Sequence, residues 1–137
     1  MSNLPGAEEN IAIKTRVLVV DDEPLIADTL VVILNINGYQ ASAAYGGVAA
    51  LERAQDFKPD VLVSDVMMPD MNGVELAVAV QKLFAKCRVV LFTGLADSTE
   101  ILHRARDHGH QFLVVFKPVH PQDLLDTLRE VRYSFDE

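Results

Sequence analysis

Five residues with charged or hydroxyl side chains lie within two positions of the end of a run of apolar residues, and their types could together carry phosphoryl chemistry. They are Asp21, Asp22, Asp65, Thr93 and Lys117. Three carboxylates brought close together repel one another and raise one another's pKa unless a cation joins them. Mg²⁺ prefers oxygen ligands and is commonly held by one or two carboxylates, waters and a phosphoryl group. These residue types therefore predict a divalent-cation site flanked by an ammonium and a hydroxyl that bind further oxygens.

Each acidic residue, taken alone, has a simpler interpretation. An aspartate that ends a strand commonly caps the following helix or lies in a solvated loop. The combination of carboxylates, hydroxyl and ammonium instead favours phosphoryl transfer to an aspartate, a reaction in which positioning and charge neutralisation do most of the catalytic work.

The apolar runs that precede these residues are expected to be strands, at residues 17–20, 40–45, 61–63, 89–92 and 112–116. Four of the five are apolar at consecutive positions, which is typical of parallel strands covered by helices on both faces. The run at 40–45 is rich in alanine and serine and is expected to be an edge strand.

Stretches with helical spacing of apolar residues separate the strands. They cover residues 24–35, 47–55 and 74–84, a fourth stretch that opens at a capping box over 97–100, and a fifth that begins at Pro121. The alternation predicts an α/β fold, a doubly wound (βα)5 open parallel sheet with helices on both faces. Ligands of such sheets bind at the carboxyl ends of the strands, so the five polar residues should converge there.

Length and composition limit the classes of function. The chain has 137 residues, 50% of them hydrophobic, which suits one domain, expected over 15–135 after a flexible leader at 1–14. A formal net charge of −8 disfavours direct binding of nucleic acid. The single cysteine, Cys87, cannot form an internal disulfide, and no apolar run approaches the length of a membrane span. We therefore expect a cytoplasmic protein.

Four motifs in order along the chain resemble the receiver domain of bacterial two-component response regulators: VLVVDDEP, VLVSDVMMPDMNG, LFTG and FKP. The resemblance covers residues 16–133. It implies a flavodoxin-like strand order 2-1-3-4-5 and a domain that accepts a phosphoryl group from a sensor histidine kinase or a phosphotransfer protein. It also implies signalling by conformational change, without catalytic turnover of an external substrate. We expect no output domain within this chain, and the downstream target stays open.

The same resemblance assigns the acidic residues. Asp65 corresponds to the phosphoacceptor, which attacks a phosphohistidine to form an acyl phosphate. Asp22, Asp65 and the backbone carbonyl of Met67 would bind Mg²⁺ directly, and Asp21 would act through a bound water.

The remaining motif positions are assigned in the same way. Thr93 and Lys117 would bind phosphoryl oxygens, and the peptide bond from Lys117 to Pro118 would be cis. The family often carries a switch aromatic three residues before the lysine, where this chain has Val114. We expect signalling to rely on Thr93 and the fourth helix, with Phe112 as a substitute aromatic. A homodimer, where one forms, is expected to use the fourth helix, the fifth strand and the fifth helix.

Two alternative functions belong to different classes. One is a Mg²⁺-dependent phosphohydrolase resembling the haloacid dehalogenases, which also use an aspartate nucleophile at a strand end. Those enzymes usually carry D-x-D after the first strand, whereas this chain has Asp21, Asp22 and Glu23. The other is a degenerate receiver that acts only as an interaction scaffold, which is disfavoured because all five site positions are filled.

Overall fold

Strands and helices alternate along residues 13–94, 99–110 and 112–136, the part of the chain that the computed structural model describes. The strands are β1 (Arg16–Val20), β2 (Gln40–Ala44), β3 (Val61–Asp65), β4 (Arg88–Thr93) and β5 (Leu113–Phe116). The helices are α2 (Pro24–Ile36), α3 (Gly47–Phe57), α4 (Gly73–Leu83), α5 (Thr99–Asp107) and α6 (Pro121–Asp136). The predicted leader, apart from residues 13 and 14, and positions 97 and 98 of the predicted capping box lie outside the described residues.

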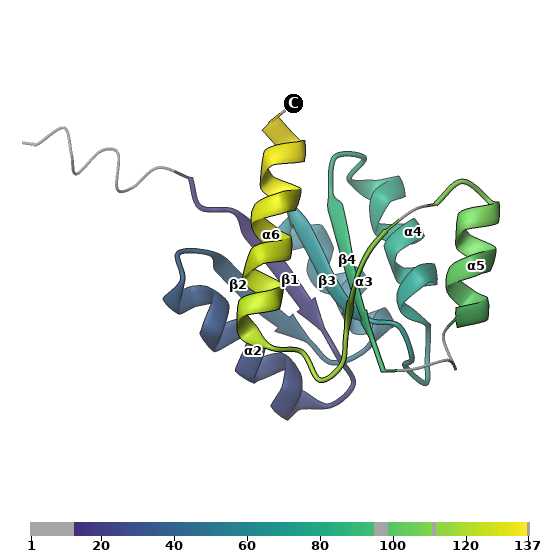
Figure 1. Ribbon diagram of the computed structural model, residues 1–137, viewed down its shortest axis with the longest axis horizontal. Helices are drawn as coiled ribbons and strands as arrows, with labels where there is room; N and C mark the ends of the chain where they lie inside the picture. Colours follow the sequence, from purple (N-terminus) through teal and green to yellow (C-terminus); the bar gives the residue numbers. More distant parts are fainter. Residues whose placement is uncertain (1–12, 95–98, 111, 137) are drawn as a thin grey trace, which may run out of the picture.

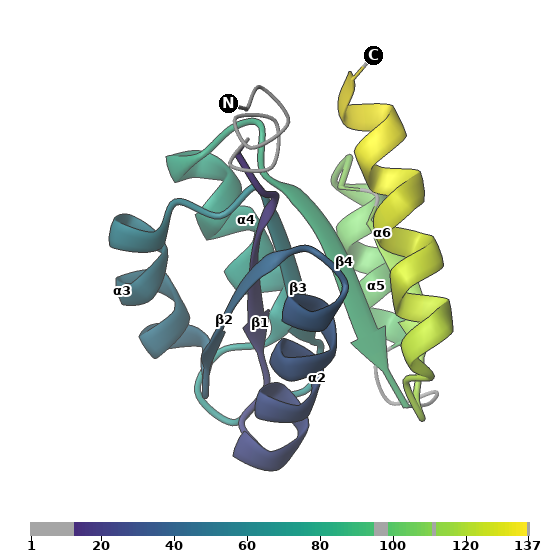
Figure 2. The ribbon, with the colours of Figure 1, turned by 90° about the vertical axis from the view of Figure 1, so that its left-hand side faces the viewer.

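The strands form one parallel sheet in the order β2-β1-β3-β4-β5. The arrowheads of β1 and β4 point to the same edge of the sheet in Figure 2, which brings the residues after each strand together. The predicted fold class and strand order are thus confirmed. The weak strand at 40–44 is an edge strand, as its composition indicated.

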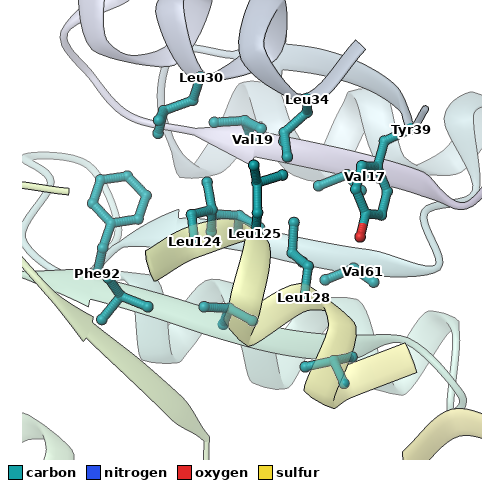
Figure 3. Close-up of a cluster of buried hydrophobic side chains, with 14 of the residues drawn as sticks. Val17, Val19, Leu30, Leu34, Tyr39, Val61, Phe92, Leu124, Leu125 and Leu128 are labelled. Carbon is teal, nitrogen blue, oxygen red and sulfur yellow. The ribbon is translucent and has the colours of Figure 1, made fainter. Parts of the chain in front are cut away.

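Helices cover both faces of the sheet (Figures 1 and 2). On one face, α2 and α6 pack side chains such as Leu34 and Leu128 against Val17 and Val19 of β1 (Figure 3). On the other face, α3 and α4 pack against a second cluster that contains Leu18 and other strand residues, and α5 adds partly buried side chains. Both faces of the central strands are therefore buried, which explains their uninterrupted apolar sequences.

Several boundaries differ from the prediction in ways that matter for the site. β3 and β4 extend to Asp65 and Thr93, so these residues are the last of their strands and not loop residues. β5 begins at Leu113, which leaves Phe112 just before the strand. Helix α6 continues to Asp136, one residue beyond the predicted domain end at 135. Among the described helices, none combines the length and the apolar character that crossing a bilayer requires.

Candidate functional site

Three aspartates meet at the carboxyl edge of the central strands. Asp21 and Asp22 follow β1, and Asp65 ends β3, the strand that pairs with β1. Ligand oxygens of all three lie within 4.8 Å of one another. Asp21 and Asp65 are buried, whereas Asp22 is exposed. The cluster predicted from the sequence is therefore formed, and it opens to solvent on the side of Asp22.

Asp21 carries an unsatisfied oxygen. Its Oδ1 accepts a hydrogen bond of 2.8 Å from the backbone N–H of Glu23, whereas its buried Oδ2 has no hydrogen-bond partner among the described residues. The pKa of Asp21 is raised to about 6, chiefly by burial and in smaller part by the nearby charge of Asp65, while the hydrogen bond from Glu23 opposes the rise. A buried carboxylate oxygen left without a donor fits a site that receives a cation, directly or through its water.

Asp65 is held between the acidic cluster and a lysine. The Nζ of Lys117 lies 3.2 Å from Oδ2 of Asp65, and the backbone N–H of Met67 donates to the Asp65 carboxylate. Burial raises the pKa of Asp65 above its ordinary value, and the Lys117 ammonium opposes part of that rise. The ammonium stabilises the ionised form of the carboxylate in a place where burial disfavours it.

Lys117 reaches the site from the end of β5. Its backbone N–H donates to the carbonyl of Thr93 at 2.8 Å, and its peptide bond to Pro118 is cis. The ammonium also lies 5.5 Å from the centre of the Phe92 ring. Thr93 is buried at the end of β4, the strand between those of Asp65 and Lys117. The structure thus brings the hydroxyl and the ammonium to the same edge as the three aspartates.

Of the residues expected to switch, Thr93 lies at this edge, whereas Val114 and Phe112 lie further from it. Val114 is partly buried in β5 beside Leu91 of β4. Phe112 lies at the opposite end of β5 from Lys117, and its ring stacks on His110 with centroids 6.1 Å apart. Phe112 packs against the core cluster on the face of α3 and α4. Its place in the fold joins it to the body of the domain and not to the acidic cluster.

The loop after β3 leads to Gly73, a residue expected to shape it, and contains Asp70, which was not predicted from the sequence. A Cβ on Gly73 would lie 2.3 Å from the carbonyl oxygen of Asp65, so only glycine allows α4 to start against the end of β3. Both carboxylate oxygens of Asp70 accept backbone hydrogen bonds from the start of α3. The signal that could have revealed Asp70 is the pair Gly46 and Gly47, which opens a helix without a side chain to cap it.

The response regulator receiver domain model matches residues 17–129 of this chain. The DNA-binding response regulator MtrA of Mycolicibacterium smegmatis is 28% identical over 125 residues, which make up 90% of this chain and 54% of MtrA. This chain therefore spans about half the length of MtrA. The chemotaxis protein CheY of Thermotoga maritima is 27% identical over 117 residues, covering 85% of this chain and 96% of CheY.

Solved structures give the same result. A CheY-like receiver domain protein from Methanospirillum hungatei superposes with a TM-score of 0.82 at 29% identity, over 90% of this chain and 98% of that one. The response regulator TrrA of Thermotoga maritima, solved in complex with Mg²⁺ and BeF, has a TM-score of 0.73 at 26% identity, over 85% of this chain and 98% of its own. Sequence motifs, strand order and site geometry agree with these matches, and the chain belongs to the response regulator receiver domain family.

Proposed function

We propose that this chain accepts a phosphoryl group on Asp65 from the phosphohistidine of a sensor histidine kinase or a phosphotransfer protein. The observation that carries the proposal is the setting of Asp65, which is buried beside two further aspartates and faces the Lys117 ammonium at 3.2 Å. The proposed site covers the catalytic positions Asp65, Thr93 and Lys117.

The reaction is a direct displacement at phosphorus. An oxygen of Asp65 forms a bond to phosphorus while the phosphorus–nitrogen bond of the donor breaks, and the leaving imidazole takes up a proton. The Lys117 ammonium and the Thr93 hydroxyl bind oxygens of the transferred group and offset its negative charge. The product is an acyl phosphate on Asp65, which loses the group again when water attacks the phosphorus.

The acidic residues fit Mg²⁺ as the cation of this site. Asp22, Asp65 and the backbone carbonyl of Met67 would hold it directly, and Asp21 would do so through a bound water. The ion, when bound, neutralises charge on the phosphoryl oxygens. The unsatisfied Oδ2 of Asp21 and the exposure of Asp22 support this assignment. The complex of TrrA with Mg²⁺ and BeF supports it independently, as a property of that relative.

Signalling would follow from a rearrangement at the end of β4 and β5. Thr93 would move toward the phosphoryl group, and the change would reach α5 through Val114 and Phe112. The surface formed by α5, β5 and α6 is the proposed face for a downstream protein or a second copy of the chain. The activity is one of relay in the cytoplasm, without turnover of an external substrate and without direct contact to nucleic acid.

Phosphotransfer from purified autophosphorylated histidine kinases tests the proposal. The wild-type chain should take label from at least one kinase in the presence of Mg²⁺, and Asp65→Ala should take none. Asp56→Ala, which removes an exposed carboxylate of α3, is the matched control and should be labelled normally. Label that persists in Asp65→Ala would contradict the assignment. Rapid hydrolysis of a generic phosphate ester without stable label on Asp65 would instead favour a phosphohydrolase.

A further inference from the structure

Helix α3 begins without a cap of its own. Its N-cap residue is Gly46, which has no side chain, and its first helical residue is Gly47. The first backbone N–H groups of a helix have no partner within the helix and are commonly satisfied by a side-chain oxygen at the N-cap. The start of α3 therefore needs an acceptor from elsewhere in the fold.

Asp70 supplies that acceptor from the loop that follows β3. Its Oδ1 accepts from the backbone N–H of Gly47 at 3.2 Å, and its Oδ2 accepts from that of Val48 at 3.0 Å. These donors lower the pKa of Asp70, so the residue is a carboxylate at neutral pH. A carboxylate at a helix N-terminus also interacts favourably with the helix dipole.

The two glycines let the loop approach α3 closely. A Cβ on Gly46 would lie 3.2 Å from Oδ2 of Asp70, and a Cβ on Gly47 would lie 2.6 Å from the Cβ of Met71. The second distance is too short for two carbon atoms, so a larger residue would push the loop away. The contact between loop and helix therefore needs the glycines at the start of α3 as well as the carboxylate of Asp70.

Backbone hydrogen bonds also hold the part of this loop that lies next to Asp65. The backbone N–H of Gly73 donates to the carbonyl of Val66 at 2.8 Å, and the N–H of Val66 donates to that of Phe92 at 3.1 Å. Met67 lies between these bonds and Asp70, and its N–H donates to the Asp65 carboxylate. Asp70 thus holds the far side of a short span that contains the proposed carbonyl ligand.

We infer that Asp70 is a positioning residue for the cation and phosphoryl site, holding the Met67 carbonyl in place by tying its loop to the start of α3. This inference rests on the proposed function, because it assigns Asp70 a role toward the site of Asp65. Asp70 touches neither cation nor phosphoryl group. Asp70 instead fixes the position of the loop backbone before the cation or the phosphoryl group binds.

Mg²⁺ binding to the purified full chain, measured by isothermal titration calorimetry, tests the inference. Asp70→Ala should weaken Mg²⁺ binding about tenfold, the lower end of what loss of an outer-shell partner costs. Asp70→Asn keeps an acceptor oxygen and should bind Mg²⁺ with intermediate affinity, which also covers the case in which the alanine variant folds poorly. Glu75→Ala is the matched control, because Glu75 accepts from the N–H of Asn72 at 3.0 Å and caps α4.

The control separates positioning from general stability. Glu75→Ala should lower the melting temperature while Mg²⁺ affinity stays at the wild-type value. Equal Mg²⁺ affinity in Asp70→Ala and the wild type would overturn the inference even when the melting temperature falls. Failure of the proposed function would give a different result, because the wild-type chain itself would then bind no Mg²⁺ and take no label on Asp65. The inferred role of Asp70 would be contradicted in that case as well.

Discussion

The ammonium of Lys117 lies 3.2 Å from the carboxylate of Asp65, although their strands, β5 and β3, are separated by β4. A long side chain therefore crosses the end of one strand to reach a buried acid. An exposed ion pair of this kind contributes little to stability, but here the carboxylate is buried. The lysine is therefore the group that favours the ionised form of Asp65 against burial, and in the proposed reaction its positive charge would face the incoming phosphoryl group.

Lys117→Ala should raise the pKa of Asp65 and slow its phosphorylation. The pKa should rise because the ammonium is the main influence that lowers it against burial. The rate should fall by about 10² or more, the usual cost of removing one charge-stabilising donor from a site. An NMR titration of the Asp65 carboxyl and labelling from a phosphodonor measure the two effects. Lys86→Ala removes an exposed lysine and should change neither. Normal labelling of Lys117→Ala would argue against the role.

Without divalent cation, Asp21 should make the protein less stable as the pH rises toward neutrality. Its pKa is about 6 in the folded protein and 3.8 as its ordinary value, so the folded state binds its proton more tightly. The stabilising contribution of the protonated form is complete below pH 3.8 and lost as the pH passes 6. Asp21→Asn should therefore raise the free energy of unfolding at pH 7.5, on the order of 1–2 kcal/mol.

Urea unfolding from pH 4 to pH 8 in the presence of a chelator measures this effect. The gain of Asp21→Asn over the wild type should be smallest at pH 4 and largest above pH 6.5. Asp56→Asn, at an exposed position of α3, should follow the wild-type pH profile. Parallel pH profiles for wild type and Asp21→Asn would show that Asp21 is not the destabilising group.

Most of the fold could be predicted because buried parallel strands have uninterrupted apolar sequences. The runs at Val17 and Val61 are apolar at every position since helices cover both faces. Strand ends were harder to predict. Asp65 and Thr93 are polar, and a polar residue after an apolar run is normally interpreted as a loop, whereas here both close their strands.

Only the site residues that lie at the ends of strands could be predicted from the sequence. Asp21, Asp65 and Lys117 each follow an apolar run, so the topology of a parallel sheet was enough to gather them. The contact of Asp70 with α3 could not be predicted from spacing, because Asp70 lies 22 and 23 residues along the chain from its two donors at the start of that helix. The contact arises because the N-cap residue of α3, Gly46, has no side chain to accept a hydrogen bond. This can be inferred from the sequence only when the first residue of the helix is known.

Mg²⁺ should raise the melting temperature, and Asp65→Asn should reduce that gain. A ligand that binds only the folded state stabilises it by RT ln(1 + [L]/Kd), about 2.7 kcal/mol at one hundred times Kd. Asp65→Asn removes a proposed ligand, and it also removes a buried charge whose pKa is raised by burial. The variant without Mg²⁺ should therefore melt higher than the wild type at pH 7.5. Calorimetric scans with and without Mg²⁺ test both parts, and an undiminished gain in Asp65→Asn would contradict the ligand role.

Gly73→Ala should disturb the site although it replaces glycine in a helix. Alanine in place of glycine ordinarily stabilises a helix by roughly 0.5–1 kcal/mol. At this position the new Cβ would lie 2.3 Å from the carbonyl oxygen of Asp65, so the end of β3 or the start of α4 has to move. Overpacking of this kind costs about 1–3 kcal/mol, and we expect a net loss of stability together with slower phosphorylation of Asp65.

Gly94→Ala provides the matched control for this substitution. Its Cβ would lie 3.9 Å from Cδ of Lys117, an ordinary van der Waals distance, so the protein should keep its stability and its rate of labelling. Urea unfolding and phosphotransfer measured on the two variants side by side separate a general effect of adding a methyl group from the clash at Asp65. A stable, normally labelled Gly73→Ala would mean that the backbone between β3 and α4 relaxes without displacing Asp65. A defect confined to Gly73→Ala would show that the close approach of α4 sets the position of Asp65.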